Sequence, residues 1–182
     1  ITFGSFNNFL KISDEVVKVW SKILKDIDNS KLILKSTLNI SKDFVLQKFE
    51  KYGVHNSIIF YKKQEVEEHI KSYKNIDLAL DTFPYNGVLT TFESLWAGVP
   101  VITMEGFNMM SRCGESILKN AQLEKLITSN KDDYIKLAIY YANNPDKLID
   151  LRLKIYNDIL KTDLFDSKQF SKDFQKKLMK VY

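Results

Sequence analysis

The residues best suited to chemistry lie within one segment, DLALDTFPYNGVLTTFESLWAGVPVITM, at positions 77–104. A turn rich in Pro, Asn and Gly follows a short apolar stretch there, and Thr90 and Thr91 begin a short helix. The free amides at a helix N-terminus carry roughly half a positive charge in effect, so they attract a diphosphate. Gly87 lets a ligand approach the backbone, and the threonine hydroxyls add hydrogen-bond donors. We therefore predict a phosphate-binding turn that contains Asn86, Gly87, Thr90 and Thr91.

Two charged residues outside this turn complete the candidate set. Lys11 follows the first apolar stretch together with Asn7 and Asn8, and a lysine in such a loop can reach an anionic group. Glu93 lies one turn into the predicted helix, where its carboxylate can accept hydrogen bonds from ribose hydroxyls. Two of these candidates also have ordinary structural explanations. Thr90 suits a helix N-cap, and Lys11 suits a solvated surface position.

Other reactive side chains are weaker candidates for functional residues. His69 falls in a helix of charged residues and suits an exposed position, while His55, in a turn, has no partner in the sequence. Cys113 lacks an identifiable base and is predicted to be a small packed residue. The motifs G-x-G-x-x-G, H-E-x-x-H and G-x-S-x-G and the P-loop lysine motif are absent. Their absence disfavours dinucleotide oxidoreductases, zinc proteases, α/β-hydrolases and NTPases.

Alternating strands and helices must position these residues. Apolar runs predict strands at 1–6, 31–36 and 57–61, at both ends of the 77–104 segment, and at 124–128. Helical spacing predicts helices at 14–27, 41–52, 65–73, 90–96, 111–120, 130–143, 145–161 and from 167 onward, with Ser13, Thr90 and Ser111 as N-caps. This alternation is typical of an α/β fold with a doubly wound parallel sheet. Ligands of such sheets bind beyond the carboxyl ends of the strands, where the candidate loops lie.

The chain is predicted to form an α/β core at 1–128 and C-terminal helices at 129–182. The closing helices are amphipathic, and we expect their apolar stripes to pack on a neighbouring layer. These stripes contain Leu148, Leu151, Ile155, Ile159, Phe170, Phe174 and Leu178. The chain begins at Ile1, without an initiator Met, and enters an apolar run at once. We therefore expect it to be a piece of a longer protein.

Composition excludes several classes of function. The 182 residues suffice for one ordinary domain, and 27 Lys and Arg against 23 Asp and Glu give a net charge of +4. The lysines are spread among acidic residues, so a nucleic-acid footprint is not expected. No apolar run approaches the roughly 20 residues of a membrane span. The single Cys113 excludes an internal disulfide and favours a reducing, cytoplasmic setting.

Four segments, in order, resemble a known family. They are FGSFNNFLKISDEVVKVWSKIL, LALDTFPYNGVLTTFESLWAGVPVIT, MEGFNMMSRCGESIL and DLFDSKQFSKDF. They resemble the C-terminal catalytic lobe of the O-GlcNAc transferases and SPINDLY-like proteins. The resemblance implies a GT-B architecture of two Rossmann-like lobes, of which this chain matches the second, donor-binding lobe. It also implies an N-terminal lobe and, usually, tetratricopeptide repeats outside this chain.

The resemblance implies an inverting, metal-independent glycosyltransferase. Such an enzyme moves a sugar, GlcNAc or a related hexose, from a UDP-sugar to Ser or Thr of a protein, with no cofactor besides the donor. Asp26 and Asp28 spell the DxD motif of many metal-dependent glycosyltransferases, but they fall at a predicted helix C-terminus, so we interpret them as surface charge. The group that activates the acceptor hydroxyl is expected in the other lobe. We expect this chain alone to bind nucleotide weakly and to turn over nothing.

The family's site residues carry over position by position. The resemblance assigns Lys11 to the pyrophosphate as the catalytic lysine, Asn8 to a position near the diphosphate, His69 to packing on uracil, Asn86, Gly87, Thr90 and Thr91 to the phosphate-binding turn, and Glu93 to the ribose. Three positions differ from the family pattern. Val88 and Leu89 stand where polar residues follow Gly87, and Val66 replaces a lysine one turn before His69. Three alternatives therefore stay open: a GDP-sugar donor, a glycan acceptor, or a non-catalytic sensor or scaffold.

Overall fold

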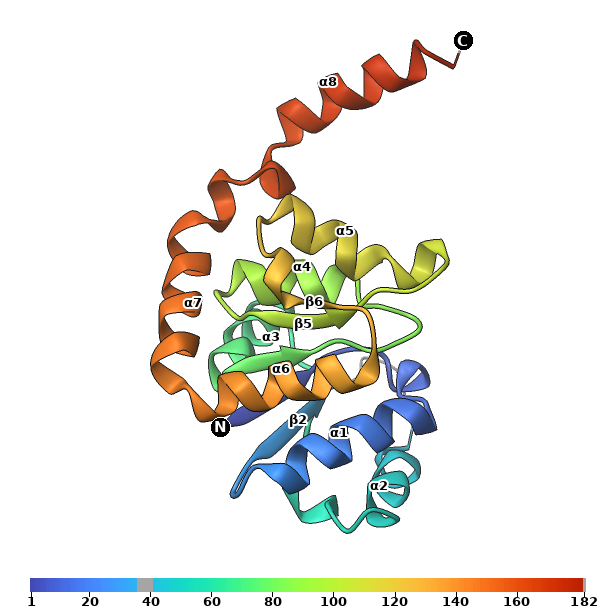
Figure 1. Ribbon diagram of the computed structural model, residues 1–182, viewed down its shortest axis with the longest axis vertical. Coiled ribbons are helices and arrows are strands. Elements are labelled where there is room, and N and C mark those ends of the chain that lie inside the picture. Colours follow the sequence, from blue (N-terminus) through green and yellow to red (C-terminus); the bar gives the residue numbers. More distant parts are fainter. Residues whose placement is uncertain (36–40, 182) are drawn as a thin grey trace.

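The chain forms a six-stranded sheet of parallel strands in the order β3-β2-β1-β4-β5-β6 (Figure 1). The computed structural model describes residues 1–35 and 41–181. The strands are β1 (Thr2–Ser5), β2 (Lys31–Lys35), β3 (Ile58–Tyr61), β4 (Leu78–Leu80), β5 (Val101–Met104) and β6 (Ile127–Thr128). Phe3 of β1 pairs with Leu32 of β2 on one side and with Leu78 of β4 on the other. Chain order therefore reverses between β1 and β4, which confirms the predicted doubly wound sheet.

Helices cover both faces of the sheet. They are α1 (Asp14–Asp26), α2 (Lys42–Glu50), α3 (Val66–Ser72), α4 (Leu89–Trp96), α5 (Cys113–Asn120), α6 (Lys131–Asn143), α7 (Pro145–Asp158) and α8 (Ser167–Leu178). Helix α1 contacts α2 and α6, whereas α4 contacts α5. Right-handed crossovers from a central switch point place these two groups on opposite faces. Helix α7 contacts both α6 and α4 and so links the two layers.

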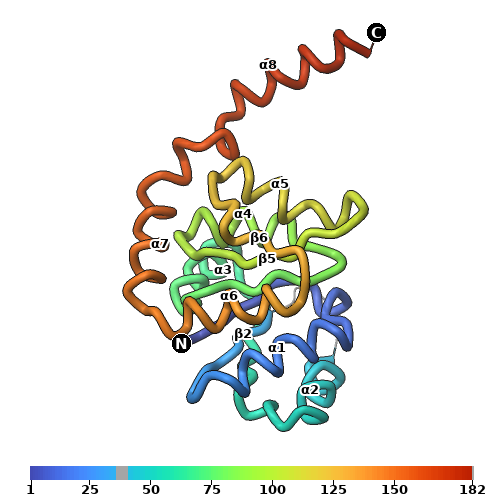
Figure 2. Tube along the Cα trace, in the orientation of Figure 1, coloured from blue at the N-terminus to red at the C-terminus, as the bar shows by residue number. Residues whose placement is uncertain are grey.

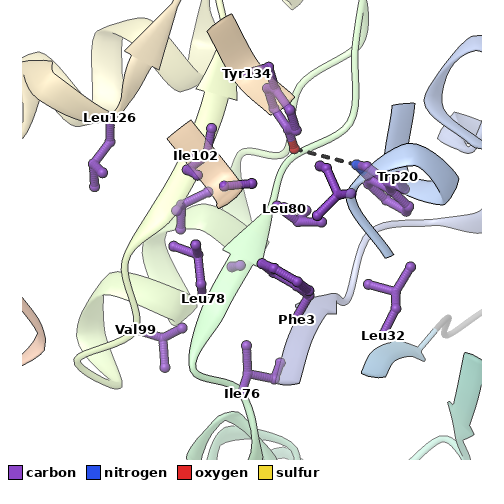
Figure 3. Packing of buried hydrophobic residues seen from close by; sticks show 14 of the residues in the cluster. Phe3, Trp20, Leu32, Ile76, Leu78, Leu80, Val99, Ile102, Leu126 and Tyr134 are labelled. Atoms are coloured by element: carbon purple, nitrogen blue, oxygen red, sulfur yellow. Dashed lines mark hydrogen bonds between the residues drawn. The ribbon is translucent and has the colours of Figure 1, made fainter. Parts of the chain in front are cut away.

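Helix α1 anchors the core beside the segment that follows β4. Ser13 caps it by accepting a hydrogen bond from the Val16 amide, as its sequence predicted. Its apolar face is fully buried, and Trp20 Nε1 donates to the Tyr134 hydroxyl of α6 at 3.4 Å (Figure 3). The Tyr134 hydroxyl donates in turn to the Asp81 carbonyl at 2.9 Å. This chain of bonds fixes the residue that directly follows β4.

Two boundaries, before β6 and before α5, differ from the prediction for local reasons. Of the predicted strand 124–128, only Ile127–Thr128 form β6; Glu124–Leu126 form a 3₁₀ turn, because the Leu126 amide bonds back to the Leu123 carbonyl. Ser111 does not cap a helix from 111 onward. It ends a 3₁₀ turn, Met109–Ser111, that Asn108 caps, and α5 begins at Cys113. Residue 36, assigned to the second strand, and residue 182, assigned to the last helix, lie outside the described residues.

The closing helices behave differently from each other. Helix α7 begins at Pro145 and buries Leu148, Leu151 and Ile155, as predicted. Helix α8 extends away from the rest of the molecule and buries none of its side chains (Figures 1 and 2). Phe170 and Phe174 stack with ring centroids 6.0 Å apart and are 68% and 53% exposed. The prediction that this stripe packs on a neighbouring layer is therefore wrong for the described chain. None of the helices described is long and apolar enough to cross a membrane.

Candidate functional site

The candidate site lies where the sheet reverses its order. Gly4 of β1 pairs with Ala79 of β4, so the segments that leave these two strands meet at one edge. Asn7 follows β1, and its Nδ2 lies 3.4 Å from Oδ1 of Asp81, which follows β4. Open parallel sheets bind their ligands at such a crevice.

Asp81 organises the turn after β4. It is 1% exposed, and its carboxylate accepts hydrogen bonds from the Gly87 amide at 2.6 Å, the Thr82 amide at 2.9 Å and Thr103 Oγ1 at 2.7 Å. Burial raises the pKa of Asp81 to about 6, and these hydrogen bonds and the charge of Lys11 oppose that shift. Sequence reasoning missed this residue, although an acidic residue directly after an apolar strand was its visible signal.

Gly87 is required by the packing of the turn. A Cβ atom at this position would lie 2.6 Å from Thr90 Oγ1 and 2.9 Å from Asn7 Oδ1. Both distances are too short for a carbon atom, so any side chain here would push apart the segments that follow β1 and β4.

Lys11 contacts the turn that follows β4. It ends a 3₁₀ turn, Phe9–Lys11, which Asn8 caps by accepting a hydrogen bond from the Leu10 amide at 3.0 Å. The Lys11 ammonium donates to the Asn86 carbonyl at 2.8 Å and lies 4.1 Å from the centre of the Tyr85 ring. Burial lowers the pKa of Lys11, and the charge of Asp81 opposes this shift. One of the three ammonium hydrogens is used in this bond, so others remain for an anion.

The predicted turn residues serve two different purposes. The buried Asn86 amide donates to the Thr82 carbonyl at 2.9 Å, and Thr91 Oγ1 donates to the Gly87 carbonyl at 3.2 Å. These two side chains therefore hold the shape of the turn. Thr90 is half-buried, and its hydroxyl donates to Asn7 Oδ1 at 3.1 Å.

Helix α4 begins one residue earlier than its sequence suggested. Its first residue is Leu89, and its N-cap is Val88, whose side chain makes no capping bond. Thr90 is therefore not the N-cap but lies in the first turn. Val88 is 42% exposed and Leu89 is 69% exposed. The first amides of an α-helix have no acceptor within the helix, so this N-terminus offers donors to an anion beside an apolar rim.

His69 and Glu93 form a second part of the site. His69 Nε2 lies 3.0 Å from Glu93 Oε2, and each side chain is less than a fifth exposed. The Tyr73 hydroxyl lies 3.1 Å from the same carboxylate oxygen, and burial raises the pKa of Tyr73. The His69 ring also lies 5.5 Å from the Phe6 ring, which follows β1. The simple interpretation of His69 as an exposed helical residue is therefore wrong.

A buried lysine that the sequence did not single out lies nearby. Lys35, the last residue of β2, is 1% exposed, and its ammonium donates to Gln64 Oε1 at 2.7 Å and to Ser72 Oγ at 3.4 Å. It lies 5.2 Å from the centre of the Phe6 ring. Burial lowers the pKa of Lys35, and the charge of Glu93 opposes this shift. A lysine that ends an apolar strand was the available signal.

The remaining candidates lie elsewhere. Asp26 and Asp28 are exposed at the end of α1, and Asp26 pairs with Lys22 at 3.0 Å, in agreement with surface charge. Cys113 Sγ lies 3.3 Å from the Met109 carbonyl. His55 Nδ1 is buried without a hydrogen-bond partner among the described residues.

The fold is that of a Rossmann-like lobe of a glycosyltransferase. The chain belongs to glycosyl transferase family 41, whose sequence model matches residues 1–174. It is 37% identical over 180 residues to a protein named probable UDP-N-acetylglucosamine–peptide N-acetylglucosaminyltransferase SPINDLY, from Eustoma exaltatum subsp. russellianum. That match covers 96% of this chain and 20% of the relative. The chain thus spans about a fifth of the length of the curated relatives it matches.

Solved structures agree with this assignment. A K341M mutant of the Thermobaculum terrenum O-GlcNAc transferase superposes with a TM-score of 0.88 at 31% identity, over 100% of this chain and 35% of that one. TarM superposes with a TM-score of 0.73 at 15% identity, over 96% of this chain and 34% of that one. The second likeness shows the fold alone.

Proposed function

We propose that this chain is the donor-binding lobe of an inverting, metal-independent glycosyltransferase. Its substrate is a UDP-sugar, GlcNAc or a related hexose is the sugar transferred, and Ser or Thr of a protein is the acceptor. One observation carries the proposal: the Lys11 ammonium is held against the turn that leads into the N-terminus of α4. A cation and free amides converge there at the switch point of a parallel sheet. The names of the SPINDLY relative and of the Caenorhabditis elegans relative, both UDP-N-acetylglucosamine–peptide N-acetylglucosaminyltransferases, support the donor and the acceptor.

The chemistry assigned to this turn is stabilisation of the leaving diphosphate. Negative charge develops on the diphosphate as the bond to the sugar breaks, and fixed donors stabilise it without reorganising. Lys11 supplies a positive charge, and the amides at the start of α4 supply dipoles. Asp81 keeps the turn in place through the Gly87 amide. Lys11 is thus the residue to which we assign catalysis, with no divalent cation needed for this step.

The nucleoside is assigned to the side of the site where His69 and Glu93 meet. The His69 ring offers a surface for uracil. Glu93 uses Oε2 for His69 and Tyr73, so its Oε1 is the oxygen assigned to a ribose hydroxyl. The group that activates the acceptor hydroxyl is assigned to an N-terminal lobe of the same polypeptide, which in this family usually follows tetratricopeptide repeats. We further propose that the protein works in the cytoplasm.

One observation favours a second candidate function. Val88 and Leu89 expose apolar side chains where the resemblance to the family implies polar groups, and this weakens the diphosphate contacts. A hydrogen bond to a charged group contributes about 1.5–3 kcal/mol, so loss of one or two could leave a lobe that binds nucleotide without transferring sugar. Such a lobe would serve as a nucleotide-sugar sensor or a scaffold. A GDP-sugar donor and a glycan acceptor are the alternatives within the enzyme class.

Calorimetric titration of the chain with UDP and with GDP tests the proposal. We expect saturable binding, stronger for UDP, that weakens about tenfold or more in Lys11→Met, because one charge-assisted hydrogen bond is lost. Lys18→Met, which removes an exposed lysine of α1, is the matched control and should bind as the wild type does. Absence of binding to either nucleotide, here and in the longer polypeptide, would contradict both the transferase and the sensor.

A further inference from the structure

Helix α7 is apolar on two sides. One side is buried against the rest of the molecule, as described above. The other side is exposed and continues into the 3₁₀ turn Ile159–Lys161 that follows the helix. Its apolar residues, called here the α7 stripe, are Ile149 (53% exposed), Leu153 (55%), Tyr156 (72%) and Leu160 (57%). Single exposed apolar side chains are common on protein surfaces, but four in a row along one helix indicate a surface that a partner covers.

The spacing of the α7 stripe is typical of a seam between two helices. Steps of four, three and four residues separate its members. Apolar residues at alternating steps of three and four form the line along which one helix packs on another. A helix that lies on a membrane surface carries Lys and Arg beside its apolar face, whereas Asp146 and Asp150 border the stripe at helical spacing. The stripe therefore fits a protein helix.

Trp96, at the end of α4, enlarges this surface. It is 54% exposed, and its ring lies 5.5 Å from the ring of Phe165, which follows α7. Two residues after it, a Cβ atom on Gly98 would lie 3.3 Å from Tyr156 Cβ, so this part of the chain adjoins the stripe. A specific interface takes about 800 Å² from each partner. The stripe and Trp96 offer roughly 100 Å² per residue, about 500 Å² in all, as an apolar core that a polar rim can complete.

The surface around the α7 stripe is complementary to itself. In an antiparallel pair of two such helices, the first residue of one stripe meets the last residue of the other, and the two middle residues meet each other. Asp150 borders the stripe near its beginning, and Lys161 borders it at its end; both are exposed. The antiparallel pairing brings Asp150 of each copy opposite Lys161 of the other copy. A two-fold axis repeats this contact, so the two copies gain it twice.

We propose that the α7 stripe and Trp96 form a dimer interface, on which α7 of a second copy of this chain packs antiparallel. Helix α7 lies along one edge of the molecule (Figure 1). Its Arg152 guanidinium donates to the carbonyls of Ile76 and Asp77 at 2.6 Å and 2.8 Å, directly before β4. The candidate donor site lies beyond the opposite, carboxyl end of that strand. The dimer therefore leaves the donor site open, and the inference does not rest on the proposed function.

Sedimentation equilibrium of the 182-residue chain measures this association. We expect the mass to rise from 21.2 kDa toward twice that value between about 1 and 100 µM, with a dissociation constant on the order of 10 µM. Leu153→Asp places two carboxylates in the seam and should weaken the dimer about tenfold or more. Phe174→Asp makes a comparable change on α8, the other helix with an exposed apolar stripe, and should leave the dimer unchanged. Both side chains are more than half exposed, so both variants should fold.

A charge exchange tests the antiparallel arrangement. Asp150→Lys faces Lys161 of the other copy with a like charge, and because the contact occurs twice it should weaken the dimer about threefold or more. The double variant Asp150→Lys with Lys161→Asp restores opposite charges and should recover most of this loss. An affinity that neither variant alters would overturn the antiparallel pairing.

Other outcomes separate the second copy from other occupants. A chain that remains a monomer at about 500 µM, or a dimer that Leu153→Asp leaves unchanged, would overturn the inference. The stripe would then fit another segment of a longer polypeptide or a different protein. Loss of the dimer in Phe174→Asp alone would assign the association to α8 and would also overturn it. Leu153→Asp should bind UDP as the wild type does, so none of these outcomes bears on the proposed function.

Discussion

The Lys11 ammonium donates a hydrogen bond to the Asn86 carbonyl at 2.8 Å, which joins the segment after β1 to the turn after β4. The two residues are 75 positions apart, and only the parallel pairing of β1 with β4 brings them together. The cation is therefore in place before a ligand arrives. Charged groups that need no rearrangement contribute most to the stabilisation of developing charge.

Asp81 makes stability depend on pH in a defined direction. Its pKa is raised from 3.8 to about 6, so between these values the native state holds a proton that the unfolded state has released. Its contribution to stability is fully present below about pH 4 and is lost as the pH rises through about 6, by at most about 1.4 kcal/mol per pH unit. Asp81→Asn should fold and should remove this component, because an amide can accept from Gly87 and donate to Thr103.

Denaturant unfolding of both proteins between pH 4 and pH 7 measures this effect. The free energy of unfolding of the wild type, minus that of Asp81→Asn, should decrease as the pH rises. A difference that stays constant across this range would show that Asp81 is ionised throughout.

Polar residues at the start of α4 should strengthen diphosphate binding. Val88→Thr with Leu89→Thr adds two hydroxyls to the exposed rim of the turn, and each hydrogen bond to a charged oxygen contributes about 1.5–3 kcal/mol before the loss of side-chain freedom. We expect UDP affinity to rise about three- to tenfold. Val88→Ala with Leu89→Ala removes the same apolar bulk without adding donors and should bring a smaller gain. Equal gains in UDP affinity from the threonine and the alanine double variants would mean that the apolar bulk of Val88 and Leu89, and not missing hydrogen bonds, limits binding.

Glu93 should determine how strongly the chain prefers a ribonucleotide over a deoxyribonucleotide. The wild type is expected to prefer UDP over 2′-deoxy-UDP, because the carboxylate accepts a hydrogen bond from a ribose hydroxyl. Glu93→Gln keeps an oxygen for His69 and Tyr73 but puts an amide NH2 in place of the acceptor at the ribose, so the preference should shrink toward equality. Competition titrations with the two nucleotides measure the ratio. A preference that Glu93→Gln leaves unchanged would confine Glu93 to its contacts with His69 and Tyr73.

Much of the fold could be predicted because the alternation of apolar strands and amphipathic helices is a local pattern. The capping of α1 by Ser13 and the Pro145 start of α7 depend on neighbouring residues, and both are confirmed. Helix α8 is the exception. Its apolar stripe is clear in sequence, but a stripe does not reveal whether a packing partner exists, and the described chain supplies none.

The site could be predicted only where it depends on chain-local turns. Lys11 and Gly87 follow apolar strands and lie where expected. Asp81 and Lys35 were missed because their partners, such as Thr103 and Gln64, come from other strands and loops that only the sheet brings near. Thr90 resembles a cap in sequence, yet the register of α4 places it in the first turn.

The most direct test of the central claim is a crystal structure of the chain with UDP. We predict diphosphate oxygens within hydrogen-bond distance, about 2.7–3.2 Å, of Lys11 Nζ and of backbone amides at the start of α4. We also predict the base on the His69 side of the sheet. A diphosphate that lies away from both Lys11 and α4, for example in the cavity between α1 and α6, would contradict the proposed donor site.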